Sequence, residues 1–270
     1  MVRWIPLPIR KLLGDFWNKL QTASRQEALL KSLSGKGTVC NVCGWEGQAF
    51  TDDPWHPGTI CPSCRSQVRH RMLAAVLDGD SLLPHLHEHS LLTGKRILHF
   101  APERQLRERI RNAASEYTTA DYDRGDCDLK LNMSAMPGVP ADSFEVAIAC
   151  DVLEHVPDDL GAMRELHRIL RPGGTAILTV PQKDPPSSTD EDSSVTDPAE
   201  RERRFGQKDH VRMYGDDFPD RLALAGFRVE TLQKDSFAQE TIDHHVLHPP
   251  KSNPNHLATN HRRIYFAKKS

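Results

Sequence analysis

Four of the six cysteines form two Cys-x-x-Cys pairs, and this arrangement is typical of a metal site. Cys40 pairs with Cys43 and Cys61 with Cys64, with 17 residues between the pairs, which matches the spacing of four-cysteine zinc sites. Four soft thiolates in two tight turns favour zinc over an iron–sulfur cluster. A closed shell of four ligands predicts a structural ion. Two disulfides are the alternative.

Three other side chains have the chemistry for proton transfer or substrate binding. Because imidazole can act as a base near neutral pH, His155 is a candidate general base, although a histidine at a helix start commonly bonds the backbone or fills space. His210 and Tyr214 are candidates for substrate contact, and the alternative is that they anchor their segment to the core. Cys127 and Cys150 have no Cys-x-x-Cys partner and are interpreted as buried thiols.

A histidine-rich stretch precedes the last predicted strand. Imidazoles bind transition metals, so a second metal site is conceivable there. The irregular spacing and three prolines instead favour a loop. Its members are Asp243, His244, His245, His248, His256 and His261.

A regular framework must position these residues, and between residues 95 and 181 short apolar runs alternate with helical patterns. This alternation predicts an α/β fold: a doubly wound, mostly parallel sheet covered on both faces. Strands are predicted at 96–100, 117–121, 128–131, 144–150, 175–180, 228–232 and 263–268. Helices are predicted at 25–33, 67–77, 105–114, 159–170 and 218–225, and a turn at 171–174 closes the fourth of these.

The amino-terminal segment, residues 1–38, predicts an amphipathic helix over residues 9–20 because its apolar residues recur at helical spacing. Residues 1–39 hold seven basic and two acidic side chains. Such a helix can rest on an anionic membrane surface or on a partner. Packing against its own protein is the favoured interpretation.

An acidic stretch, residues 184–200, contains six acidic side chains, three prolines and no lysine or arginine. This composition predicts a flexible loop. Because the stretch follows the fifth predicted strand, it falls near the edge of the sheet where ligands bind, and it could act as a lid. Disorder alone explains the composition equally well.

The stretch from Asp142 to Pro181 reads DSFEVAIACDVLEHVPDDLGAMRELHRILRPGGTAILTVP. It resembles the class I S-adenosylmethionine-dependent methyltransferases of the type 11 group, which carry a strand, Leu-Glu-His-Val, a helix, Leu-x-Pro-Gly-Gly and a strand ending in proline. The segments 206–218 and 225–227 resemble the later region of the same group. The resemblance covers about two-thirds of the chain. It implies a seven-stranded, Rossmann-like sheet and S-adenosylmethionine as cofactor.

The resemblance also implies positions for the cofactor-binding residues. In the family the first strand ends in an acid followed by Gly-x-Gly, whereas this chain has His99, Ala101 and Glu103 there. Ala101 is still small, and Glu103 could face the ammonium group of the cofactor. Asp121 ends the second strand about twenty residues later, at the spacing expected for a ribose contact. The alternative is that Asp121 caps a helix or forms a turn. The family places an acid and a small residue in contact with adenine, and Asn132 and Met133 stand at these positions here. Cys150 lies at the edge of the expected pocket.

The resemblance implies an S-adenosylmethionine-dependent methyltransferase, with a small molecule, a sugar or a lipid-linked compound as the expected acceptor. Near-neutral charge and an acidic stretch beside the site argue against a phosphate backbone. Two alternatives remain: an RNA methyltransferase whose zinc ribbon grips RNA, and a non-catalytic binding protein that kept the fold. The missing Gly-x-Gly supports the second.

Length and composition bound these interpretations. The 270 residues carry 35 basic and 37 acidic side chains, and 38% of them are hydrophobic, which is enough for a core. No apolar run is long enough to span a bilayer, and prolines and charges interrupt the start where a secretion signal would lie, so a cytoplasmic protein is expected. We expect three parts: a helical segment at 1–38, a zinc ribbon at 39–80 and a methyltransferase domain at 81–270.

Overall fold

A seven-stranded sheet forms the centre of the computed structural model, which describes residues 22–77, 91–183, 188–255, 257 and 259–270. The strand order is β10-β11-β7-β6-β3-β4-β5, and the neighbours from β7 to β5 are parallel, whereas β11 runs antiparallel to both its neighbours. The strands are β3 (Arg96–Phe100), β4 (Glu116–Asp121), β5 (Leu129–Lys130), β6 (Phe144–Cys150), β7 (Leu170–Thr179), β10 (Phe227–Leu232) and β11 (Ile264–Lys269). The predicted doubly wound, mostly parallel sheet is confirmed.

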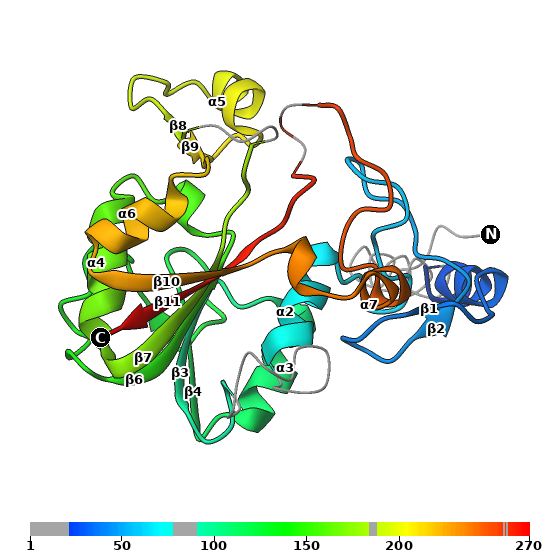
Figure 1. The fold of residues 1–270 in the computed structure, drawn as a ribbon, viewed down its shortest axis with the longest axis horizontal. Coiled ribbons are helices and arrows are strands. Elements are labelled where there is room, and N and C mark those ends of the chain that lie inside the picture. The colour runs from blue at the N-terminus through cyan, green and yellow to red at the C-terminus, as the bar shows by residue number, and fades with distance from the viewer. Residues whose placement is uncertain (1–21, 78–90, 184–187, 256, 258) are drawn as a thin grey trace, which may run out of the picture.

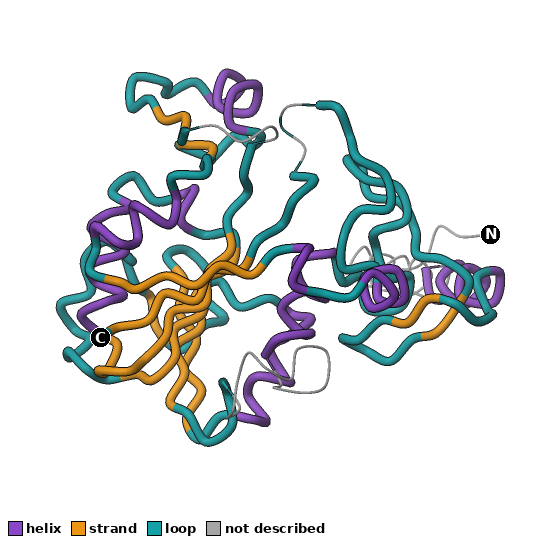
Figure 2. The backbone as a smooth tube through the Cα atoms, in the orientation of Figure 1, coloured by secondary structure: helices purple, strands orange, loops and turns teal. Residues whose placement is uncertain are grey.

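Alternate residues of the central strands face two separate apolar layers. Leu98 and Phe100 of β3 pack with α4 (Asp159–Ile169) and α6 (Phe218–Leu224), whereas Ile97 packs with α2 (Val68–Leu77) and α3 (Arg104–Ala113) on the other face. Figures 1 and 2 show the sheet between these two pairs of helices. Both faces are therefore covered, as a buried parallel sheet requires.

The cysteine segment lies to one side of the sheet. It comprises a helix over residues 22–32, the short antiparallel strands β1 (Thr38–Val39) and β2 (Glu46–Gly47), and the loop that leads to α2. Helix α7 (Gln239–His245) lies beside these strands in Figure 1, and the His245 ring bonds the carbonyl of Val39 at 2.9 Å. The segment thus packs on a part of the chain two hundred residues away.

The remaining elements lie at the carboxyl edge of the sheet or connect its strands. They are the short helices η1 (Leu153–His155) and η2 (Lys234–Ser236), the antiparallel pair β8 (Asp190–Glu191) and β9 (Arg212–Met213), and α5 (Pro198–Phe205). Among the described residues, no helix is long and apolar enough to cross a membrane.

Two predictions from the sequence need correction. The acidic stretch is not an irregular loop throughout, because β8 forms within it and Asp197 caps α5 by accepting from the amide of Glu200. Its carboxylates are paired with arginines: Asp190 and Asp192 both contact Arg204. The predicted turn at 171–174 is instead a bulge at the start of β7, where the pairing register with β6 shifts.

Residues 1–21 are outside the described part of the chain, so the helix predicted at 9–20 remains a prediction. The prediction of a helix at 25–33 agrees with the helix over residues 22–32. The other predicted helices and strands agree with observed elements to within one residue at each end, except that β7 begins five residues earlier than predicted.

Candidate functional site

The carboxyl ends of β3, β4, β6 and β7 lie at one edge of the sheet because these strands are parallel. The chain leaves β3 toward β4 on one side and later returns to form β6 on the other side. The order of strands therefore reverses between β3 and β6, and such a switch point is where doubly wound sheets bind nucleotides. The residues that follow these strand ends form the candidate site.

The loop after β3 has an unusual backbone at Ala101. Its φ is +43°, in the left-handed region that favours glycine, and its amide donates to the carbonyl of Ala120 on β4 at 2.8 Å. The loop thus adopts at Ala101 a conformation that glycine adopts more easily. The absence of glycine in the sequence does not prevent a tight turn here.

Glu103 begins α3 with its carboxylate directed inward. One oxygen, Oε2, bonds Nε2 of His99 at 3.1 Å, and the other, Oε1, is buried and has no hydrogen-bond partner among the described residues. His99 is fully buried, and the Tyr117 hydroxyl bonds its Nδ1 at 2.9 Å. Burial raises the pKa of Tyr117, so the hydroxyl keeps the proton that it donates. His99 therefore holds Glu103 in place, while Oε1 remains available to a ligand.

Asp121 and Asn132 follow the next two strand ends. Asp121 accepts from the amides of Asp123 and Arg124 through Oδ1, at 2.9 and 3.0 Å, so it does form a turn. Its second oxygen has no bond to a described residue. Asn132 accepts from the amide of Ser134 at 3.0 Å, which leaves its side-chain amide nitrogen for a ligand. The next residue, Met133, is buried in the core layer of α4.

Asp151, directly after β6, is held by two arginines. Its carboxylate contacts Arg262 at 2.8 Å and Arg69 at 3.4 Å, and it accepts from the hydroxyl of Thr179 at 2.9 Å. Burial by itself would raise the pKa of Asp151, but these cations and the hydroxyl bond outweigh it and hold the pKa at about 2. Cys150 beside it is a buried thiol whose pKa burial raises. Asp151 is therefore an anchor for arginines that come from two distant segments.

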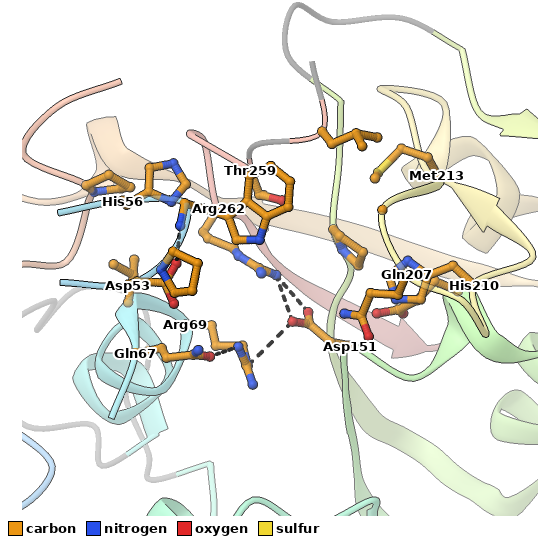
Figure 3. Close-up of a pocket in the computed structure, with 18 of the residues that line it drawn as sticks. Asp53, His56, Gln67, Arg69, Asp151, Gln207, His210, Met213, Thr259 and Arg262 are labelled. Atoms are coloured by element: carbon orange, nitrogen blue, oxygen red, sulfur yellow. Dashed lines mark hydrogen bonds and ion pairs between the residues drawn. The ribbon is translucent and has the colours of Figure 1, made fainter. Parts of the chain in front are cut away.

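A cleft of about 590 Å³ opens beyond the ends of β6 and β7. The predicted cofactor-binding residues lie outside its lining: His99, Ala101, Glu103, Asp121, Asn132, Met133 and Cys150. Its walls come from the cysteine segment, the start of α2, η1, the segment after α5 and the carboxyl-terminal loop (Figure 3). Such a volume is typical of small-molecule sites. Charged and aromatic residues on its walls include Asp53, Trp55, His56, Arg69, Asp151, Glu154, His155, His210 and Arg262.

Glu154, His155 and His210 meet on the wall of this cleft. Their ligand atoms all lie within 4.8 Å of one another, and the two imidazole rings stack edge to face with centroids 4.7 Å apart. Glu154 is buried, and burial together with the charge of Asp151 raises its pKa well above the ordinary value. Burial lowers the pKa of His210, which is therefore neutral.

Tyr214 does not line the cleft, contrary to its prediction as a substrate contact. It is fully buried, its hydroxyl donates to Asp159 at 2.8 Å, and its ring packs edge to face on Phe218. The alternative role, anchoring its segment to the core, is the one that the structure shows. The fully buried His99 and the Glu103 carboxylate that it bonds are also outside the set of residues that line the cleft.

The four cysteine thiols form a compact cluster. The sulfur atoms of Cys40 and Cys64 lie 3.7 Å apart and those of Cys43 and Cys61 lie 3.8 Å apart, and all four lie within 4.8 Å of one another. These separations are far longer than a disulfide bond of about 2.05 Å. Burial raises the pKa of Cys43 to about 11 in the absence of a cation.

Sequence reasoning did not identify Arg69, Arg262 and Trp55 as part of the site. Arg69 lies in a predicted helix, and Arg262 and Trp55 lie in stretches without a chemical motif. They reach the cleft because α2 and the carboxyl-terminal loop pack on either side of Asp151. Conservation of these three side chains among relatives would have been the available signal. A single sequence carries no information on conservation.

Comparisons with known proteins identify one family. The profile of a family described as "Methyltransferase domain" matches residues 34–232. No curated protein sequence matches the chain at a significant level.

Among solved structures, an S-adenosylmethionine dependent methyltransferase from Mesorhizobium loti is 17% identical, with 72% of this chain and 100% of that chain covered and a TM-score of 0.46. The 1,6-didemethyltoxoflavin-N1-methyltransferase of Burkholderia thailandensis, solved with S-adenosylhomocysteine, is 15% identical, with 66% and 72% covered and a TM-score of 0.45. A SAM dependent methyltransferase from Archaeoglobus fulgidus is 13% identical, with 74% and 91% covered and a TM-score of 0.45.

Proposed function

The chain belongs to the methyltransferase domain family, and from this membership we propose that it transfers a methyl group from S-adenosylmethionine to an acceptor held in the cleft. The observation that carries the proposal is the family match over residues 34–232, which includes the four strand ends of the site and the cysteine cluster. S-adenosylmethionine supplies a methyl group activated on a sulfonium. The protein's part is to orient the two reactants and exclude water.

Glu103, Asp121 and Asn132 are proposed to hold the cofactor. The buried Oε1 of Glu103 has no partner among the described residues, and a carboxylate in that state fits an ammonium group. The second oxygen of Asp121 would accept from ribose hydroxyls, while the side-chain amide of Asn132 and the thioether of Met133 would contact adenine. Ala101 would bring the backbone close to the methionine part, and Cys150 would lie at the edge of the pocket.

The cysteine cluster is proposed to bind one zinc ion. A tetrahedral site with zinc–sulfur bonds of about 2.3 Å has sulfur–sulfur edges of about 3.8 Å, and the two measured separations are 3.7 and 3.8 Å. Four protein ligands close the coordination shell, so zinc here would stabilise the fold. This zinc-binding segment supplies one wall of the cleft through Trp55 and His56.

A small molecule is the proposed acceptor. The cleft has a volume within the range of small-molecule sites, and its walls mix aromatic side chains with paired charges. His155 and His210 lie on the same wall and would contact the acceptor. The acidic stretch repels a phosphate backbone less than its composition indicated, because Arg204 pairs with both Asp190 and Asp192. The volume of the cleft therefore supports a small acceptor better than the charge of the acidic stretch does.

The proposal is tested by incubating the zinc-loaded protein with a metabolite extract and with cofactor carrying a labelled methyl group. We expect mass spectrometry to find label in a small molecule, and we expect the Glu103→Gln variant to transfer much less. Label found only in added structured RNA would favour an RNA methyltransferase instead. Cofactor binding without transfer to any fraction would indicate a non-catalytic binding protein.

A further inference from the structure

We propose that Glu154, His155 and His210 form a second metal site, which binds a divalent transition-metal ion on the wall of the cleft. Their ligand atoms lie within 4.8 Å of one another, and all three residues line the cleft. The site is separate from the cysteine cluster. It is also separate from the histidine-rich stretch before the last strand, where the sequence analysis considered a metal site.

Two buried polar atoms of this group lack a hydrogen-bond partner within the described part of the chain. Glu154 Oε2 and His210 Nε2 are both buried and make no hydrogen bond to a described residue. An unpaired buried polar atom is costly, and two such atoms beside one another are rare in a folded protein. Both are lone-pair donors, and a cation shared between them accounts for both at once.

The histidines are oriented as metal ligands usually are. The Nδ1 of His210 donates to the carbonyl of Phe205 at 2.8 Å, which leaves Nε2 deprotonated. The Nδ1 of His155 lies 3.1 Å from the carboxylate of Asp209, which leaves its Nε2 as a ligand. A metal-binding histidine typically bonds an oxygen acceptor through its other ring nitrogen, because this fixes the ring and its tautomer.

The backbone around the group is fixed by one buried arginine. Arg212 donates to three backbone carbonyls, those of Leu153, Val156 and Pro157. These bonds fix the position of η1. The amide of Val211 donates to the carbonyl of Glu154 at 2.9 Å. The segment that carries His210 is therefore held against the segment that carries Glu154, and the three ligands come from a rigid frame.

The ligand set indicates the class of ion. Two imidazoles and one carboxylate suit zinc, iron(II), cobalt or nickel better than magnesium or calcium, which prefer oxygen ligands. Three protein ligands leave at least one open position, in contrast to the closed cysteine cluster. Because the group lines the cleft, the open position is accessible to the acceptor. If the proposed function holds, the acceptor binds the ion through an oxygen donor.

Cobalt(II) titration of protein that already carries zinc on the cysteine cluster tests the site. We expect one equivalent to bind with the weak visible bands of nitrogen and oxygen ligands, without the intense bands of thiolate ligands. His155 is half-buried, so His155→Asn is the variant least liable to disturb the fold, and Glu154→Gln is the second. Each should weaken cobalt binding at least about tenfold. The control, His244→Ala, changes an exposed histidine outside the cleft and should bind as the wild type does.

Two results would overturn the metal site: no cobalt equivalent beyond the cysteine cluster, or unchanged affinity in both folded variants. Binding of S-adenosylmethionine, measured in the same samples, separates this proposal from the proposed function. Cofactor binding without cobalt binding refutes only the second metal site. Cobalt binding without cofactor binding refutes only the proposed function.

Discussion

At the scale of single residues, Glu103 and His99 stand where the resemblance to methyltransferases implies glycine and an acid. The structure shows how the two work together, because the His99 ring bonds one Glu103 oxygen and leaves the other free and buried. The acidic side chain expected at the end of β3 is instead supplied by Glu103, the residue directly before α3. The departure from the family pattern is thus compatible with a cofactor site.

Replacing Glu103 by Gln removes the charge and keeps the shape. We expect the Kd for S-adenosylmethionine to rise about tenfold or more, because a charge-assisted hydrogen bond becomes a neutral one. Isothermal titration calorimetry measures this change. Glu108→Gln is the matched control, since Glu108 is an exposed residue of the same helix. Equal affinities for wild type and Glu103→Gln would remove Glu103 from the cofactor site.

Asp121→Ala tests the ribose contact independently. The loss of a carboxylate that bonds two hydroxyls should weaken cofactor binding about tenfold or more. Asp121 also accepts two amide bonds in its turn, so the melting temperature must be measured alongside the affinity. The neighbouring exposed Asp123→Ala serves as control. A variant that melts lower yet binds the cofactor normally would leave Asp121 with the turn role alone.

His70 makes the stability of the fold depend on pH. Burial lowers the pKa of His70 to about 4, against an ordinary value of about 6.5. Between these two pH values His70 is therefore neutral in the folded protein and protonated in the unfolded chain. The free energy of unfolding should therefore fall as pH drops from about 6.5 to 4, by about 3 kcal/mol from this group alone. Urea unfolding across this range should give a shallower pH dependence for His70→Gln than for wild type. Parallel curves would contradict the assignment.

At the scale of elements, the sequence predicts the sheet better than the site. The strands and the helices beside them were identifiable because their apolar residues alternate or recur at helical spacing, and both patterns are local. The cleft was not, because its walls come from residues 53–59, 67–69, 205–213 and 249–262, which no local pattern links. The burial of Tyr214 could not be predicted for the same reason, because its hydroxyl donates to the carboxylate of Asp159, which is distant in the sequence.

Arg71 of α2 links the cysteine segment to the chain directly after α7. Its fully buried guanidinium donates to the carbonyls of Thr59, Ser66 and Val246 at 2.7–2.9 Å, and it lies 4.4 Å from the centre of the Phe50 ring. Replacement by Met leaves these carbonyls buried without donors. We expect Arg71→Met to lower the free energy of unfolding by about 3–5 kcal/mol.

Chemical denaturation of Arg71→Met beside Arg25→Ala, a change at an exposed position of the helix over residues 22–32, measures this difference. The control should stay within about 0.5 kcal/mol of wild type. A similarly small effect of Arg71→Met would mean that α2 and the cysteine segment are held together by other contacts.

At the scale of the whole molecule, the boundary predicted near residue 80 remains a proposal, and the packing shows strong connection across it. The buried residues of α2 belong to the same apolar layer as α3, and the cysteine segment packs on α7. If the cysteine cluster holds zinc, its loss should therefore disturb the cleft as well as the segment itself.

Cys43→Ser should abolish zinc binding at the cysteine cluster, because three thiolates no longer close the shell. Cys127→Ser is the control, since Cys127 lies outside the cluster, and it should keep one equivalent of zinc at this site. Metal analysis of the purified variants gives the answer. Undiminished zinc in Cys43→Ser would show that the cluster does not bind the ion as proposed.

Calorimetric titration of the zinc-loaded wild-type protein with S-adenosylmethionine, and separately with S-adenosylhomocysteine, tests the central claim most directly. The structure leads us to expect one equivalent of each bound per chain. Affinity should fall in Glu103→Gln and Asp121→Ala and should be retained in Glu108→Gln. A folded, zinc-loaded protein that binds neither compound would contradict the account of this chain as a methyltransferase.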